Sequence, residues 1–202
     1  MKFLLGRKQN MTQYFDEEKG EAIPVTLVSV SPLTVTATKE SGKDGYDAVQ
    51  VGFETQKESR LTKAVLGHTK GQPFKVLKEF RLDSTPSYNI GDTITADTFA
   101  KGDVVFVRGI SKGKGFQGVV KRHGFHGGRR THGQKHSERE PGSIGGGLRS
   151  RVPKGMRMAG RMGNDLVNTK NLEIIDVDMT NNIVAVKGAL PGRRGTLIEI
   201  VG

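Results

Sequence analysis

Three glycines in one short stretch have the spacing of a dinucleotide-binding loop. Residues 113–118, Gly-Lys-Gly-Phe-Gln-Gly, match the G-x-G-x-x-G pattern, in which backbone N–H groups lie against a pyrophosphate. In that fold the third glycine opens a helix that packs on the sheet, whereas the repeated glycines of residues 119–128 predict no helix here. A nucleotide-dependent oxidoreductase therefore remains only the weaker alternative.

Histidines form the second group with chemical potential. Four of the five, His123, His126, His132 and His136, fall within fourteen positions. Imidazole is a common metal ligand, but the lysines and arginines interleaved with these rings disfavour a dication. We predict no metal site, and we expect the imidazoles to stack on bases or to donate to phosphates.

Other enzyme motifs are incomplete. Pro141 stands where a Gly-x-Ser-x-Gly elbow around Ser143 requires its first glycine. Neither of the Gly-Lys pairs at 42–43 and 113–114 is followed by Ser or Thr, so the chain has no Walker sequence. The chain has no cysteine, which excludes disulfides, thiolate metal sites and cysteine nucleophiles. We predict a protein that is not an enzyme and that takes no cofactor and no small-molecule substrate.

Positive charge is concentrated in one glycine-rich window. The 202 residues include 32 Lys and Arg and 21 Asp and Glu, a net charge of +11. Residues 108–163 hold 14 of the cations, two acids (Glu138 and Glu140) and 15 of the 28 glycines, so their net charge is +12 and that of the remaining 146 residues is −1. Such segregation favours a polyanionic partner over a basic surface that merely aids solubility.

The cations of this window suit phosphate recognition. Glycines between them let backbone N–H groups approach a phosphate closely, and the arginine guanidinium binds phosphate with two hydrogen bonds or stacks on a base. A general DNA-binding protein stays open as an alternative. The predicted nucleic-acid-binding residues, which the resemblance described below assigns to RNA, are Lys112, Lys114, Phe116, Lys121, Arg122, His123, Phe125, His126, Arg129, Arg130, His132, Lys135, His136, Arg139, Arg149, Arg151, Lys154, Arg157 and Arg161.

Short apolar runs that end at turn residues indicate strands on both sides of the window. We expect strands at residues 23–30, 33–37, 48–53, 74–82, 103–107, 172–178, 183–186 and 197–201. A single short helix is expected at Ser59–Leu66, before Gly67. Many short strands without alternating long helices predict a closed or sandwiched antiparallel sheet.

Because strands flank the window, it leaves a β domain and returns to it. We expect a domain of residues 1–110 plus 164–202 and an extended loop of residues 111–163. The loop has too few apolar residues to offset its ordering entropy, so we expect it to be mobile when free and ordered by a partner. No stretch is long and apolar enough for a membrane span. The first residues have an apolar patch of only three residues, Phe3–Leu5, which is far short of the apolar region of a signal peptide, so we expect a soluble protein.

A series of motifs resembles the bacterial-type ribosomal protein L3 family of the large subunit. The likeness begins at Ser111–Gly118 and covers nearly the whole chain. It continues in order through Lys121–Phe125, Thr131–Gly133, Arg139–Gly145, Lys154-Gly155, Met158–Gly160, Met162-Gly163, Asn171-Leu172 and Val186–Gly192.

This resemblance implies a mainly β fold: a six-stranded, translation-protein-like β-barrel with a long basic, Gly-rich extension between strands and a short helical insertion. It implies a cytoplasmic structural constituent of the ribosome that binds large-subunit ribosomal RNA, supports early assembly and contacts neighbouring large-subunit proteins, with no membrane partner.

The resemblance also places a loop tip near the peptidyl transferase centre, without a role in its chemistry. The implied tip residues are Gly142, Ser143, Ile144, Gly145, Gly146, Gly147, Leu148, Arg149, Ser150 and Arg151. The run Gly146–Pro153 is one residue shorter than in many members and lacks the glutamine that is methylated in some, so we expect no methylation there.

Overall fold

The computed structural model describes residues 1–16, 20–82, 87–146 and 150–202. By its internal contacts the chain separates into a β unit, Met1–Ile110 with Leu166–Gly202, and a basic segment, Ser111–Asp165. The described residues are mainly β with few, short helices, which confirms the predicted fold class at that level. No helix among them is long and apolar enough to cross a membrane.

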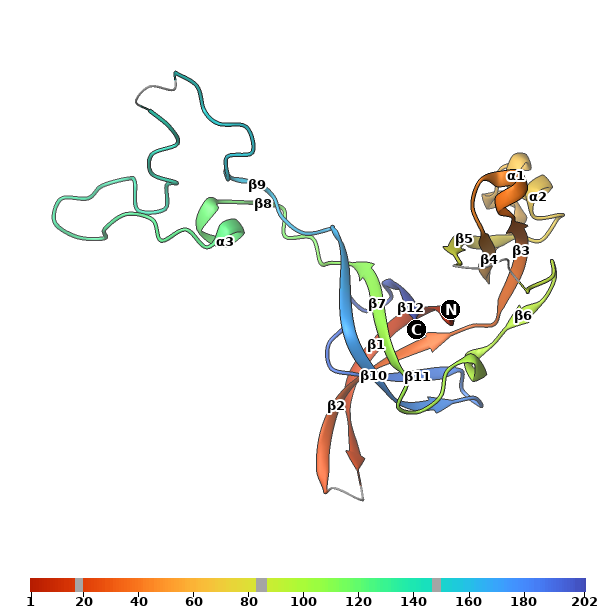
Figure 1. Cartoon of the computed structure of the whole chain (residues 1–202). Coiled ribbons are helices and arrows are strands. Elements are labelled where there is room, and N and C mark those ends of the chain that lie inside the picture. The colour runs from red at the N-terminus through yellow and green to blue at the C-terminus, as the bar shows by residue number, and fades with distance from the viewer. Residues whose placement is uncertain (17–19, 83–86, 147–149) are drawn as a thin grey trace. The chain divides into compact units, whose positions relative to one another are not determined.

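Six antiparallel strands of the β unit close into a barrel. Their order is β1 (Phe3–Asp16), β12 (Leu197–Val201), β7 (Val104–Ile110), β10 (Leu166–Asp178), β11 (Ile183–Lys187) and β2 (Glu21–Val30), and β2 pairs back to β1. Figure 1 shows these strands around one another. Closure leaves the barrel without an unpaired edge strand.

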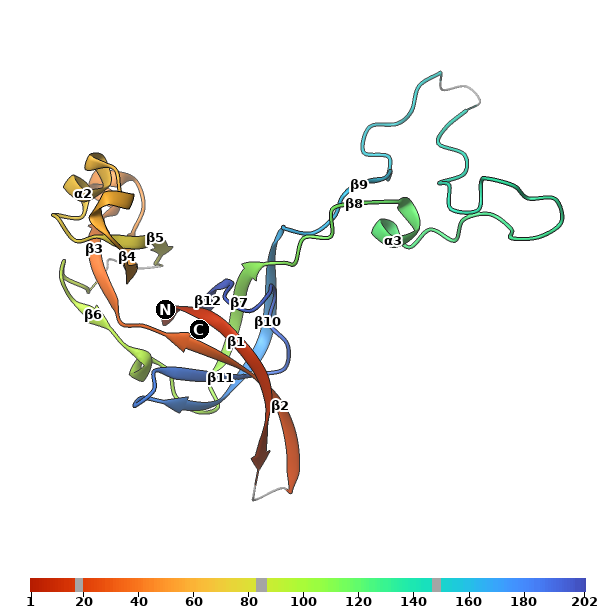
Figure 2. The same ribbon diagram turned by 180° about the vertical axis from the view of Figure 1, so that it is seen from behind.

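Both chain ends lie on this barrel. The backbone N–H of Lys2 donates to the carbonyl of Gly202 at 3.0 Å, and that of Gly202 donates back to Lys2 at 2.9 Å. In Figure 2 the N and C labels accordingly stand close together. These two bonds continue the pairing of β1 with β12, so residues at opposite ends of the chain form the same part of the sheet.

A second sheet of four strands belongs to the same unit. Its order is β5 (Phe74–Arg81), β4 (Ala48–Thr55), β3 (Leu33–Lys39) and β6 (Thr93–Ile94). One helical turn, α1 (Ser41–Asp44), joins β3 to β4, and short 3-10 turns lie at Glu58–Arg60 and Ala96–Thr98.

The predicted helix at Ser59–Leu66 is shifted in the structure. Residues 58–60 form the 3-10 turn, Leu61 is extended, and α2 spans Lys63–His68. The reason is Thr62, whose hydroxyl oxygen accepts a hydrogen bond from the Val65 N–H at 3.4 Å and so caps a helix that begins one residue later.

One hydrophobic core joins the barrel to the smaller sheet. The rings of Phe3 in β1 and Phe80 in β5 stack with centroids 4.3 Å apart, and both side chains are buried. Charged pairs bridge the same two layers: the Arg7 guanidinium in β1 contacts both carboxylate oxygens of Glu54 in β4 at 3.0 Å. This hydrogen bonding lowers the pKa of Glu54, against the opposing effect of its partial burial.

Candidate nucleic-acid interface

The base of the basic segment is a narrow pair of antiparallel chains. The Ser111 N–H donates to the Asp165 carbonyl at 2.9 Å, and the Lys114 N–H donates to the Met162 carbonyl at 2.9 Å. Farther along, β8 (Phe116–Gln117) pairs with β9 (Gly160–Arg161). Backbone hydrogen bonds rather than side-chain packing hold these chains together.

Gly163 is required at this base by space and by conformation. Its φ is +77°, and a Cβ built on it would lie 2.1 Å from the Lys112 carbonyl oxygen. A side chain at this position would therefore separate the two chains. Gly113, across the pair, has no such constraint, because the nearest atom to its Cβ is 3.9 Å away.

The prediction that residues 119–128 form no helix is wrong for their first half. Residues Val119–His123 form one helical turn, α3, which ends at Gly124 with φ +74°. The Arg122 guanidinium and the His123 ring both bond to the Met158 carbonyl, at 2.7 and 3.1 Å. This fixes α3 against the returning chain, although the turn is too short to build the long helix of a dinucleotide-binding fold.

Beyond α3 the chain forms a hollow lined by Gly124, Phe125, His126, Gly127, Gly128, Gln134, Ser137, Glu140, Pro141 and Gly142, with a volume of about 580 Å³. Its two sides meet where the Gly128 N–H donates to the Glu138 carbonyl at 2.9 Å. The Arg130 guanidinium also pairs with the Glu138 carboxylate at 2.6 Å.

The basic segment carries much charge and almost no core. Among its described residues only Val119 is buried. It has 13 Lys and Arg against Glu138, Glu140 and Asp165. Of the twelve cations within the described ranges, Arg130 alone forms an ion pair. Most of this charge is thus uncompensated within the described chain and available to an external anion.

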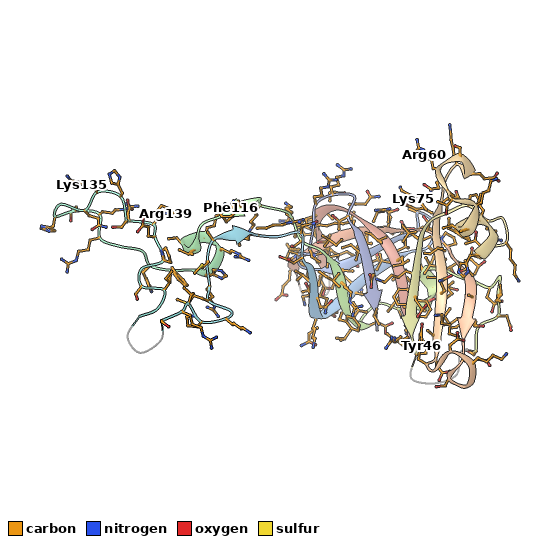
Figure 3. All side chains as sticks on the ribbon, turned by 90° about the horizontal axis from the view of Figure 1, so that it is seen from above. Tyr46, Arg60, Lys75, Phe116, Lys135 and Arg139 are labelled. Carbon is orange, nitrogen blue, oxygen red and sulfur yellow. The ribbon has the colours of Figure 1, made fainter. Side chains whose placement is uncertain are left out.

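Most predicted RNA-binding side chains are exposed. Figure 3 shows the side chains along this segment, with Phe116, Lys135 and Arg139 labelled. The exposed members are Lys112, Lys114, Phe116, Lys121, His126, Arg129, Arg130, His132, Lys135, His136, Arg139, Arg151, Lys154, Arg157 and Arg161, while Arg122, His123 and Phe125 are half-buried. Arg149 lies outside the described residues.

The tip residues implied by the resemblance are described in part. Gly142, Ser143, Gly145, Gly146, Ser150 and Arg151 are exposed and Ile144 is half-buried. Gly147, Leu148 and Arg149 lie outside the described residues. The Ser143 hydroxyl donates to the Gly145 carbonyl at 3.2 Å, so it is hydrogen-bonded to a residue two positions away in its own loop.

The clustered histidines do not converge. His123 contacts the Met158 carbonyl and lies 6.1 Å from the Phe125 ring, His126 lines the hollow, and His132 and His136 are exposed. Within residues 1–16, 20–82, 87–146 and 150–202, no group of three or more His, Asp or Glu side chains has a geometry that could hold a metal ion.

Two features of the interface were not anticipated from sequence. The Met158 carbonyl receives two side chains of α3, and a backbone acceptor carries no signal in the residue types. Gln134, Ser137 and Glu140 line the hollow. The one available clue was that Glu140 is a rare acid in a cationic window, yet its spacing alone does not show what it faces.

Comparison with known proteins gives a consistent result. The model of the family described as Ribosomal protein L3 matches residues 32–201. The protein named large ribosomal subunit protein uL3 from Herpetosiphon aurantiacus is 47% identical over 200 residues, covering 98% of this chain and 94% of that protein.

Two further relatives agree. The protein of the same name from Desulfotalea psychrophila is 48% identical over 202 residues, covering 98% and 96%. Large ribosomal subunit protein uL3c of Guillardia theta is 46% identical over 201 residues, covering 98% of both chains. The family comprises structural proteins and not enzymes. On this evidence the chain belongs to the ribosomal protein L3 family.

Proposed function

We propose that this protein is a structural constituent of the large ribosomal subunit, located in cytoplasmic ribosomes, and that it binds large-subunit ribosomal RNA. Support comes from the family and from relatives that carry the name of a large-subunit protein. Neighbouring large-subunit proteins are its other partners.

The proposal divides the work between two domains. Residues 1–110 plus 164–202 form a translation-protein-like barrel domain, and residues 111–163 form an extended loop that penetrates RNA and binds it through the predicted RNA-binding side chains. The tip, residues 142–151, reaches toward the peptidyl transferase centre without taking part in its chemistry. The protein acts early in subunit assembly, because RNA strands that repel one another can pack only once their charge is neutralised.

One observation carries this proposal: the basic segment has many exposed cations, and within the described residues only Arg130 has an acidic partner. A segment in which one described side chain is buried gains little from its own packing. Its stabilising partner must then be external and anionic, and a phosphate backbone offers regularly spaced charges that match such a chain.

Counterion release supplies the free energy of binding. Each neutralised phosphate releases about 0.7 to 0.9 of a condensed cation, so contacts with roughly eight phosphates give a slope of log affinity against log salt near −6 to −7. Exposed lysines without intramolecular partners cost little to engage, since no ion pair has to be broken first.

The test compares two variants of the full chain with equal loss of charge. One replaces Lys112, Lys114, Lys121 and Lys154 of the basic segment by Gln. The other replaces Lys43, Lys57, Arg60 and Lys63 of the β unit by Gln. All eight are exposed, and no described acid pairs with them. Figure 3 labels Arg60, which lies on the β unit.

Affinity for large-subunit ribosomal RNA is measured by filter binding from 50 to 400 mM KCl, with excess duplex DNA as competitor. The segment variant should flatten the slope by about 3, because four phosphate contacts are lost, and the control should keep most of the wild-type slope. Equal flattening in both would refute the division of labour. A wild-type slope near zero, or complete displacement by duplex DNA, would refute specific RNA binding.

A further inference from the structure

Specific contacts between residues 127–130 and Glu138 hold together the two sides of the hollow in the basic segment. A Cβ at Gly127 would lie 2.1 Å from the Glu138 carbonyl oxygen, so the two sides approach as closely as they do only because residue 127 has no side chain. The bonds from the Gly128 N–H and the Arg130 guanidinium to Glu138 then hold them together. Both of these contacts are made by groups of the segment itself.

Glu140 is the unexplained group in the wall of this cavity. The other acid of this stretch, Glu138, has Arg130 as its partner. No described cation lies within ion-pair distance of the Glu140 carboxylate. In a segment that faces a polyanion, such a carboxylate weakens binding unless it accepts hydrogen bonds from the partner. Phosphodiesters offer no such donors, whereas base edges do.

The other groups of the wall are suited to a flat ring with a polar edge. Phe125, His126 and Pro141 provide ring faces for stacking, as in the recognition of unstacked RNA bases. The Gln134 amide donates to the Ser137 hydroxyl, which fixes two polar groups beside them. A volume of about 580 Å³ is within the range of pockets that hold small organic groups.

We propose that this hollow takes one unstacked guanine of the RNA, whose N1–H and N2–H donate to the two carboxylate oxygens of Glu140. Guanine is selected because it alone among the four RNA bases presents two adjacent N–H donors on its Watson–Crick edge. Adenine and cytosine present one amino group beside an acceptor, and uracil presents a single N–H between two carbonyls. The inference rests on the proposed RNA-binding function and names a base-specific contact within it.

The experiment uses the full chain and three single-stranded RNA probes: heptamers of uridine with guanosine, inosine or adenosine at the centre. Inosine lacks the N2 amino group but is otherwise close to guanosine. Binding is measured by fluorescence anisotropy at fixed salt for the wild type, for Glu140→Gln and for Asp165→Asn. The last variant removes the same charge from the segment at a residue outside the hollow.

The wild type should prefer the guanosine probe over the adenosine probe by roughly tenfold, as for a bidentate contact between side chain and base, and inosine should lose most of that preference. Glu140→Gln should reduce the preference to less than twofold, while Asp165→Asn should keep it. Equal wild-type affinity for all three probes, or a preference that survives Glu140→Gln, would overturn the inference.

The guanine contact and the proposed RNA-binding function can be refuted separately. Steeply salt-dependent binding of large-subunit RNA without any base preference would refute the guanine contact and leave the proposed function standing. Loss of both would refute the function itself.

Discussion

A single methyl group at Gly163 should open the base of the basic segment. In Gly163→Ala the new Cβ would lie 2.1 Å from the Lys112 carbonyl oxygen, and the residue would keep a φ of +77°. The left-handed backbone costs Ala about 1 kcal/mol relative to Gly. Separation of the chains then weakens two hydrogen bonds of Met162. Its carbonyl accepts from the Lys114 N–H, and its N–H donates to the Gly115 carbonyl. Each bond contributes roughly 1 kcal/mol. The total is about 2 to 3 kcal/mol.

Amide hydrogen exchange of the free protein measures this directly. A loss of about 2 kcal/mol corresponds to roughly 30-fold faster exchange at Lys114 and Met162. Gly113→Ala is the matched control, because its Cβ would lie 3.9 Å from the nearest atom. In this variant the exchange rates of Lys114 and Met162 should stay within about threefold of those in the wild type. Unchanged protection in Gly163→Ala, or equal loss in both variants, would refute the close approach of the two chains.

Two further predictions concern the β unit. Phe3→Ala should lower the free energy of unfolding by about 3 to 5 kcal/mol in urea denaturation, because Phe3 is buried and stacked on Phe80. The control Phe116→Ala should leave this free energy unchanged, because the Phe116 side chain is 76% exposed. Similar losses in both variants would contradict the core that the barrel and the smaller sheet share. The pKa of Glu54 is lowered by Arg7, so this carboxylate stabilises the fold at neutral pH, and the contribution is lost as pH falls through the folded-state pKa. Urea midpoints from pH 6 to pH 3 should therefore fall more steeply for the wild type than for Glu54→Gln, and parallel curves would exclude the ion pair.

Hairpins and short strands with alternating side chains were predictable because their signals are local. The strand at 197–201 has the bounds expected from sequence, and the hairpin of β10 and β11 turns at Asn181-Asn182 as expected. Asp178 completes that turn: its carboxylate accepts from the Asn181 side-chain amide and from the Asn181 and Thr180 backbone N–H groups, which lowers its pKa. No distant residue is needed to form this structure.

Strand β1 gave no comparable signal. Its first residues, Phe3, Leu4, Leu5 and Gly6, are all buried, because this part of the strand is covered on one face by the barrel interior and on the other by the smaller sheet. A strand buried on both faces loses the alternation that identifies a strand in sequence. A register shift between Lys8 and Met11 further disrupts the pattern.

For the basic segment, the charge and the glycine content could be predicted from the sequence, whereas the three-dimensional arrangement of its residues could not. Counting Lys, Arg and Gly separated the segment from the rest of the chain. The hollow depends on contacts between positions ten apart, such as Gly128 with Glu138, and α3 depends on the Met158 carbonyl 35 residues beyond His123. Contacts of this kind follow from the tertiary path of the chain and not from residue spacing.

The proposed function depends above all on the basic segment being the part of the molecule that binds RNA. Hydrogen exchange of the full chain, free and bound to large-subunit ribosomal RNA at equal salt, tests it most directly. We predict that binding strongly raises the protection of residues 111–165 above its level in the free chain, with little change in the barrel strands. Protection confined to the β unit, with residues 111–165 exchanging as fast as in the free chain, would contradict the claim.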